Sequence, residues 1–209
     1  MLAISIGIYP LLYLLVDETF GLLNTKADSL LEDPLWKSLF YLHINSGGIA
    51  LLSGWSQFHT KLRQKNLNLH KVLGKIYVIS VLLSGSAGLY LGFHATGGLI
   101  SSTGFISLGL IWLTSTYLAY SSVRNKDIRR HQYWMYFSYA ACFAAVTLRI
   151  WLPFLTWLTA DFITAYRIVS WLCWVPNIIF AFIITRSLDK SVQGAQEDVD
   201  QDRNLSVNR

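Results

Sequence analysis

The amino-acid sequence predicts an all-α, polytopic transmembrane helix bundle, and three observations lead to this fold class. The 209-residue chain is 53% hydrophobic, and only 14% of its residues are charged, whereas charged residues make up about a quarter of a soluble domain. Its mean hydropathy is +0.40. Long apolar runs alternate with short connections, and the basic residues are concentrated in every second connection. This alternation is typical of a chain that crosses a bilayer several times.

Five apolar runs are long enough to cross a hydrocarbon layer about 30 Å thick, which takes roughly 20 helical residues. They are 36–58, 72–93, 103–123, 133–152 and 162–185. A sixth run, 2–16, is shorter and lacks the basic start and cleavage site of a secretory signal, so it is predicted to be a retained helix, or alternatively a surface or re-entrant segment. We expect about six helices with a four- to five-helix core in residues 1–188, and a disordered polar tail in 189–209.

The basic residues also predict an orientation. Connections 60–69 and 124–130 contain seven Lys and Arg residues, whereas connections 17–35, 94–102 and 153–161 together contain one, Lys26. Because basic connections stay on the cytoplasmic side, we expect both termini in the cytoplasm and the bundle in the plasma membrane, the inner membrane of a bacterium. The net charge of +5 then reflects topology and contact with membrane lipids, and it indicates no nucleic-acid partner.

The run 36–58 carries an unusual helix face. His43, Gly47, Ala50, Gly54 and Gln57 follow one another in steps of four, three, four and three, which places them on one side of a helix. Such a face favours a tight crossing with another helix. The alternative is a flat cofactor that lies against Gly47 and Gly54 with His43 near its edge.

Four segments together resemble a known family of predicted multi-pass membrane proteins. They are HINSGGIALLSGWSQF at 43–58, LHKVLGKIYV at 69–78, HQYWM at 131–135 and TLRI at 147–150. In combination they are similar to the family called domain of unknown function 2306, over about residues 36–185. The resemblance implies a multi-helix membrane architecture and very little about activity.

His70 and His131 form a predicted inner pair. They lie at the start of runs 72–93 and 133–152, which both lead outward from the cytoplasmic face, so they share one membrane depth. Imidazoles on facing helices are the usual axial ligands of haem b, and the arrangement is similar to cytochrome b561-type haem proteins. His43 would then serve an outer haem, although run 103–123 has no histidine opposite it. The alternatives are backbone capping or headgroup contact, or a non-haem metal ion.

An outer site is predicted around two arginines inside apolar runs, where a guanidinium is rare and usually has a partner or faces water. Arg149 lies eighteen residues, or about five turns, after His131. Its depth is therefore close to that of Arg167 and His43. We expect His43, Asn45, Arg149 and Arg167 to converge on a pocket for a carboxylate, a haem propionate or a lipid phosphate.

Two functions follow from these sites. In the first, the protein is a membrane oxidoreductase or electron carrier that passes electrons through haem b to a quinone or a redox partner protein. In the second, it is a non-enzymatic binding, assembly or transport protein with an outward pocket for an anion or lipid. The sequence contains no P-loop, HExxH or GxSxG motif, so common soluble-enzyme chemistries are not indicated.

Overall fold

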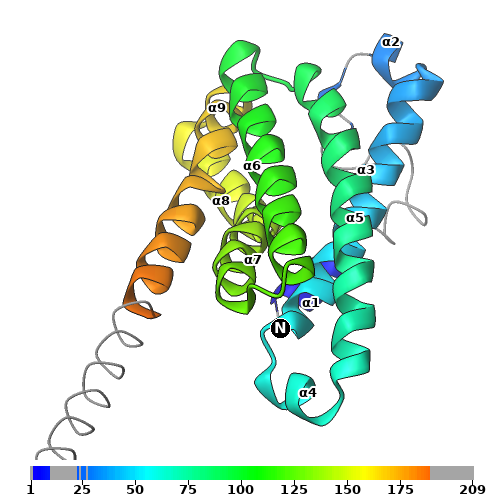
Figure 1. The fold of residues 1–209 in the computed structure, drawn as a ribbon. Coiled ribbons are helices and arrows are strands. Elements are labelled where there is room, and N and C mark those ends of the chain that lie inside the picture. The colour runs from blue at the N-terminus through cyan, green and yellow to red at the C-terminus, as the bar shows by residue number, and fades with distance from the viewer. Residues whose placement is uncertain (1, 10–22, 24, 27, 189–209) are drawn as a thin grey trace, which may run out of the picture.

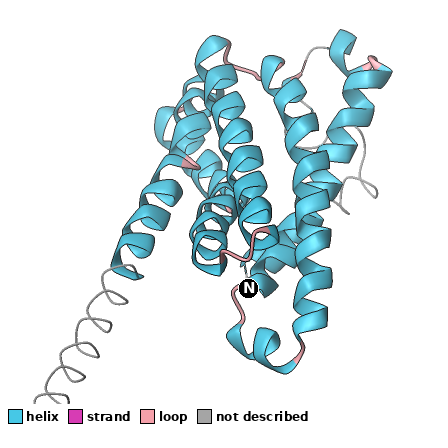
Figure 2. Cartoon of the chain, in the orientation of Figure 1, coloured by secondary structure: helices cyan, strands magenta, loops and turns pink. Residues whose placement is uncertain are grey.

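The computed structural model describes residues 2–9, 23, 25–26 and 28–188, and every regular element within these ranges is a helix (Figures 1 and 2). The helices are α1 (Leu2–Ile8), α2 (Asp28–Leu31), α3 (Pro34–Gln57), α4 (Thr60–Lys65), α5 (Leu67–Phe93), α6 (Leu99–Arg124), α7 (Ile128–Cys142), α8 (Ala144–Thr159) and α9 (Phe162–Leu172). The predicted all-α bundle is confirmed. The predicted tail at 189–209 and residues 10–16 of the first predicted helix lie outside the described residues.

Within the described ranges, four helical segments are long and apolar enough to cross a membrane. They are Leu67–Phe93 (α5), Leu99–Arg124 (α6), Ile128–Thr159 (α7 together with α8) and Phe162–Leu188 (α9 and the residues that follow it). Each contains one of the last four predicted runs. α3 covers the remaining long run, 36–58, but stands outside this set, because residues such as Asn45, Gly47 and Gln57 reduce its apolar character. The chain is therefore a polytopic membrane protein whose most polar long helix, α3, packs against the spans.

Short polar side chains define where the helices begin. An Asp or Asn side chain accepts a hydrogen bond from a free amide in the first turn of α3, α5, α7 and α9; these residues are Asp33, Asn66, Asp127 and Asp161. Such caps satisfy amides that have no partner inside the helix. The sequence thus sets the start of each of these four helices locally.

The helices pack in an order that brings separate parts of the chain together. α5 lies between α3 and α6, α6 also contacts α7 and α9, and α8 packs on α9, while α1 crosses α3 and α8. Small residues permit the close crossings: a Cβ at Gly85 would lie 2.7 Å from Leu113 of α6, and a Cβ at Gly104 would lie 2.7 Å from the Ser170 carbonyl oxygen of α9. Small residues of α5 and α6 therefore permit close contact between helices.

The two ends of the bundle differ in charge. α4 and the connection from α6 to α7 lie at one end, which we call the basic end, while α2 and the connection from α5 to α6 lie at the opposite end (Figure 1). The basic end carries the seven Lys and Arg residues counted above, whereas Asp28 of α2 and the following Glu32 and Asp33 are acidic. The charge asymmetry seen along the sequence thus becomes an asymmetry between two faces of the folded bundle.

Candidate functional site

A cavity of about 700 Å³ lies inside the bundle. Buried side chains in the described part of the chain form three apolar clusters, around Tyr77, around Val169 and around Trp36, and the cavity lies where residues of all three meet. Its volume is within the range of about 300–1,000 Å³ that is usual for small-molecule sites. The cavity is the leading candidate for a functional site.

Most of the cavity wall is apolar, and part of it is nearly free of side chains. Aromatic rings come from several helices: Trp36, Phe40, Phe105, Trp112, Phe162 and Tyr166. Six glycines also line it: Gly47, Gly48, Gly85, Gly88, Gly92 and Gly109. Along α3 the lining extends from Trp36 to Leu51, which at 1.5 Å per residue is about 22 Å. The cavity is therefore elongated along the bundle and shaped for an apolar body.

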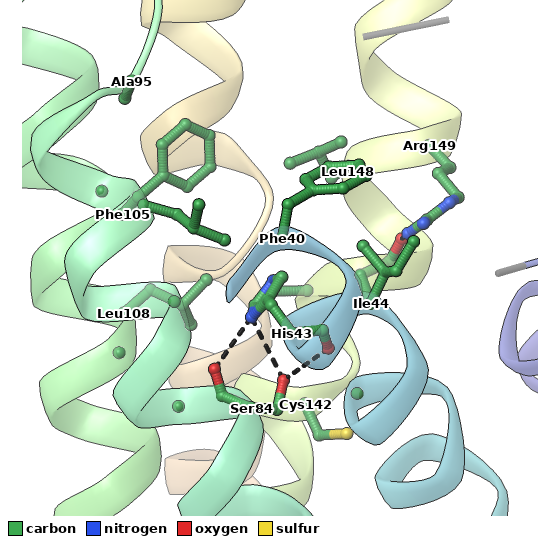
Figure 3. A pocket seen from close by; sticks show the side chains of 18 of the residues that line it. Phe40, His43, Ile44, Ser84, Ala95, Phe105, Leu108, Cys142, Leu148 and Arg149 are labelled. Carbon is green, nitrogen blue, oxygen red and sulfur yellow. Dashed lines mark hydrogen bonds between the residues drawn. The ribbon is translucent and has the colours of Figure 1, made fainter. Parts of the chain in front are cut away.

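His43 is held in the cavity wall by α5. Its Nδ1 lies 2.8 Å from the Ser84 carbonyl oxygen, and Ser84 Oγ donates to the His43 carbonyl oxygen at 2.9 Å (Figure 3). Because a carbonyl oxygen only accepts, Nδ1 carries the proton and Nε2 is the accepting nitrogen of the ring. The ring packs on Gly88, where a Cβ would lie 2.9 Å from Nδ1. The glycine therefore makes room for the imidazole.

Arg149 of α8 lines the same cavity. One terminal nitrogen donates to the Ala145 carbonyl oxygen at 2.9 Å, and the guanidinium carbon lies 4.8 Å from the centre of the Tyr9 ring. This is the geometry of a cation–π contact. Arg149 is also close enough to His43 to interact with it electrostatically. The structure thus brings together two residues that the sequence analysis expected at one depth.

Lys26 is a cavity residue that the sequence analysis did not place in a site. It lies in the connection before α2, lines the cavity, and donates from Nζ to the His94 carbonyl oxygen at 2.6 Å. Burial lowers the pKa of Lys26 to about 8. Its position was the one available sequence signal, because Lys26 is the one basic residue in the three connections opposite the basic end.

The charged residues on the described part of the cavity wall share one sign. Among the described residues that line it, only Lys26 and Arg149 carry a formal charge, and no Asp or Glu accompanies them. The described part of the wall therefore combines apolar surface with two basic side chains.

The other predicted outer residues lie elsewhere. Arg167 is exposed and donates from Nε to the Gly97 carbonyl oxygen at 2.8 Å, and Asn45 donates to the Tyr41 carbonyl oxygen of its own helix at 2.8 Å. Neither lines the cavity. Asp161, near Arg167, caps α9, and hydrogen bonds from Thr164 hold the pKa of its carboxylate below the ordinary value.

The two glycines predicted to face a cofactor have different surroundings. Gly47 lines the cavity, with Ser84 Oγ 3.0 Å from where its Cβ would be. Gly54, two turns further along α3, faces the rings of Tyr77 and Tyr139, which would lie 2.6 and 2.7 Å from a Cβ there. The face is thus open beside Gly47 and closely packed at Gly54.

His70 and His131 lie near each other at the basic end. Tyr77 Oη and Ser138 Oγ form a 2.6 Å hydrogen bond between α5 and α7, and each histidine is seven residues, about two turns, before one of these partners. The two rings are close enough to interact electrostatically. The structure therefore brings the predicted inner pair together, although neither residue lines the cavity.

The ring nitrogens of the inner pair have different environments. His131 Nδ1 lies 2.8 Å from the Ala119 carbonyl oxygen, so Nε2 is its lone-pair nitrogen, whereas His70 Nδ1 is buried with no hydrogen-bond partner. Within the described residues, no group of three or more His, Cys, Asp or Glu side chains is arranged for a metal ion. A metal bound by the pair would need ligands of another kind.

Comparisons with known proteins place the chain in a family. A family model described as "Predicted membrane protein (DUF2306)" matches residues 40–185. No curated protein and no solved structure matches the chain significantly. The matched residues include His43, Lys71 to Tyr77 and Arg149, and they cover well over half of the sequence. The chain therefore belongs to the DUF2306 family of predicted membrane proteins.

Proposed function

We propose that the protein binds an elongated amphipathic molecule inside the bundle, with its apolar body against the glycine and aromatic walls and its polar end beside Arg149 and His43. The observation that carries this proposal is the cavity of about 700 Å³ in which those two side chains lie. A concave, largely apolar pocket of this size with a few polar groups is typical of a small-molecule site. Binding, with no chemical step, is the function supported best.

The orientation of the site follows from the same proposal and from charge. The positive-inside rule favours the basic end, with α4 and the α6–α7 connection, on the cytoplasmic side of the plasma membrane. The end of the cavity near Ala95 and Lys26 would then face outward, because the connection from α5 to α6 lies opposite the basic end. Both termini would be cytoplasmic in this arrangement.

Thermal unfolding of the purified protein in detergent tests binding. Cys142 and Cys173 are both buried, so a thiol-reactive fluorophore reports unfolding directly. Hexadecanoate, hexadecyl phosphate and hexadecanol are added separately, and a molecule that binds the native state raises the Tm in a concentration-dependent manner. We expect at least one of the three to do so. No shift with any of them would contradict the proposal.

A pair of variants on α6 locates the binding. Leu108 lines the cavity, whereas Leu110 is 50% exposed on the outer surface of the same helix. Leu108→Trp fills part of the cavity and should abolish the ligand-induced shift, while Leu110→Trp should preserve it. Equal shifts in both variants would place the bound molecule outside the cavity.

Electron transfer through haem b is a second candidate, favoured by the inner pair. His131 keeps Nε2 for a ligand while Nδ1 is held by a backbone carbonyl, which is the usual support for a coordinating imidazole. A quinone or a redox partner protein would receive the electrons. Oxidised and dithionite-reduced visible spectra of protein made with ample haem test this function.

The haem spectra have clear expected outcomes. Soret and α bands that disappear in both His70→Ala and His131→Ala, but persist in His43→Ala, would support the inner haem. Wild-type protein without these bands would exclude it, and this result would leave the binding proposal unaffected.

A further inference from the structure

We infer that the Nζ amine of Lys26 forms a reversible imine with an aldehyde whose apolar chain lies in the cavity. This inference rests on the proposed function and goes beyond it, since it adds a covalent bond to the binding and names the atom that forms it. It comes from the place of Lys26 in the cavity, from the hydrogen bond that holds its amine and from the chemistry of a buried lysine.

Lys26 places a primary amine at one end of an elongated apolar cavity. Its side chain lines the cavity, and Nζ donates to the carbonyl oxygen of His94, which follows the last residue of α5. Trp36 begins the cavity lining of α3 and belongs to the same apolar cluster as Leu91, three residues before His94. From there the lining extends along α3 to Leu51, over about 22 Å. An amine at the end of such a cavity meets the end of a bound chain, which favours a terminal carbonyl group, that is, an aldehyde.

The hydrogen bond to His94 suits both the free amine and its product. Nζ lies 2.6 Å from the His94 carbonyl oxygen, so one N–H points at the backbone. A neutral amine keeps a second N–H and a lone pair beside that bond. A protonated imine retains one N–H, which can donate to the same oxygen. The carbonyl group of His94 can therefore position the nucleophile before the reaction and stabilise the product after it.

Burial gives Lys26 the chemistry of a nucleophile. Removal from water disfavours the charged ammonium and lowers the pKa of Lys26 to about 8, against 10.5 for an ordinary lysine. At pH 7 its neutral fraction is therefore roughly 300-fold larger than that of an ordinary lysine. The neutral amine is the form that attacks a carbonyl carbon, and desolvated lysines are the usual Schiff-base residues of proteins.

The reaction needs only the amine, the aldehyde and water. The nitrogen lone pair forms a bond to the carbonyl carbon, the π electrons of the carbonyl group move to oxygen, and a proton passes from nitrogen to that oxygen. The nitrogen lone pair then forms the C=N bond while the C–O bond breaks, and the oxygen leaves as water with the second proton of the amine. Hydrolysis reverses both steps, so release requires no further reagent.

Reductive trapping tests the inference. Purified protein in detergent is treated at pH 7 with hexadecanal and sodium cyanoborohydride, which reduces the imine to a stable secondary amine. Peptide mass spectrometry then gives the rate of modification at each lysine. We expect Lys26 to react about tenfold or more faster than Lys61 and Lys65, which are exposed on α4. A rate at Lys26 no higher than at these two lysines would overturn the inference.

A short aldehyde and two variants of α6 test the place of the chain. Propanal carries the same reactive group without a long chain, so it should prefer Lys26 over Lys61 less strongly than hexadecanal does. Leu108→Trp fills part of the cavity and should reduce the preference of hexadecanal to that of propanal, whereas Leu110→Trp, at a position 50% exposed, should leave it unchanged. Equal preferences of the two aldehydes, or equal rates in the two folded variants, would place the chain outside the cavity and overturn the inference.

A matched pair of lysine variants assigns the adduct. Lys26→Arg keeps a cation but has no primary amine, so the rapid adduct should be absent from its intact mass, while Lys61→Arg should still form it. A rapid adduct that persists in Lys26→Arg would contradict the inference. The Tm of each variant before treatment shows that it is folded.

Failure of the inference is distinguishable from failure of the proposed function. If Lys26 shows no preferential reaction while hexadecanoate, hexadecyl phosphate or hexadecanol still raises the Tm, the imine is wrong and binding in the cavity stands. If none of these three probes raises the Tm, the proposed function fails, and the inference that rests on it fails as well.

Discussion

His43 and Ser84 exchange hydrogen bonds in both directions across the contact between α3 and α5. The imidazole Nδ1–H donates to the Ser84 carbonyl oxygen at 2.8 Å, and the Ser84 hydroxyl donates to the His43 carbonyl oxygen at 2.9 Å. Each residue therefore supplies a side-chain donor and a backbone acceptor. This reciprocal pair fixes the ring that lines the cavity, and it joins the most polar long helix to a membrane span.

Replacing Ser84 by Ala removes one half of this exchange. We expect Ser84→Ala to reduce the free energy of unfolding by about 1 kcal/mol, because the His43 carbonyl oxygen loses a buried partner. The Tm measured with the thiol-reactive fluorophore checks this. Thr114→Ala is the control, since the exposed Thr114 hydroxyl only donates within its own helix, to Leu110 and Ile111. Equal losses in the two variants would contradict a structural role for the interhelical bond.

Gly88→Ala tests the packing of the imidazole. A Cβ at this position would lie 2.9 Å from two ring atoms of His43, so either the ring or α5 must move. Such overpacking costs about 1–3 kcal/mol. Gly74→Ala on the same helix is the control, because its Cβ would meet the flexible end of Gln57, at 3.1 Å. A Tm drop no larger for Gly88→Ala than for Gly74→Ala would show that the ring has room to shift.

Lys26 predicts two pH dependences of opposite sign. Its pKa is about 8 in the folded protein and 10.5 ordinarily, so between these values the unfolded chain binds more protons. The stability of the wild type relative to Lys26→Gln should therefore rise with pH across this interval. Binding of hexadecanoate should instead weaken as the pH rises through about 8, because the amine loses its charge.

Measuring the stability and the hexadecanoate affinity of the wild type and of Lys26→Gln at pH 7 and pH 9 checks both trends. Among the described residues, the other titratable side chains on the cavity wall are His43, Cys142, Tyr9 and Tyr166, and Arg149 stays charged throughout. A loss of hexadecanoate affinity at pH 9 that persists in Lys26→Gln would assign the pH dependence to one of these groups. A loss that disappears in Lys26→Gln assigns it to the lysine.

Much of the site could be predicted because helices convert sequence spacing into depth and direction. His43 and Arg149 were expected at one depth, and both line the cavity. The same reasoning placed Arg167 with them, but the turn at Gly97 presents a carbonyl oxygen that binds its guanidinium. Helical periodicity gives the position of a side chain along the helix axis and the helix face that carries it. It does not predict which loop will contact that side chain.

The sequence around Lys26 could not predict that its side chain lines the cavity. It meets a carbonyl oxygen 68 residues further along the chain, and a contact between two connections depends on how the helices that carry them pack. Gly47 and Gly54 illustrate the same limit, since they share a face of α3 while only Gly54 is covered by tyrosine rings. The difference comes from side chains of α5 and α7, which the sequence of α3 does not contain.

The sequence by itself determined the helical membrane class, the separation of basic from acidic connections and the position of each histidine along the helical runs. These properties follow from hydrophobicity and from 1.5 Å of rise per residue, and both act locally along the chain. Only the tertiary structure decided that Lys26, His43 and Arg149 face one cavity of about 700 Å³. An internal cavity depends on how side chains from many helices fail to fill the space between them, so it has no local signature in the sequence.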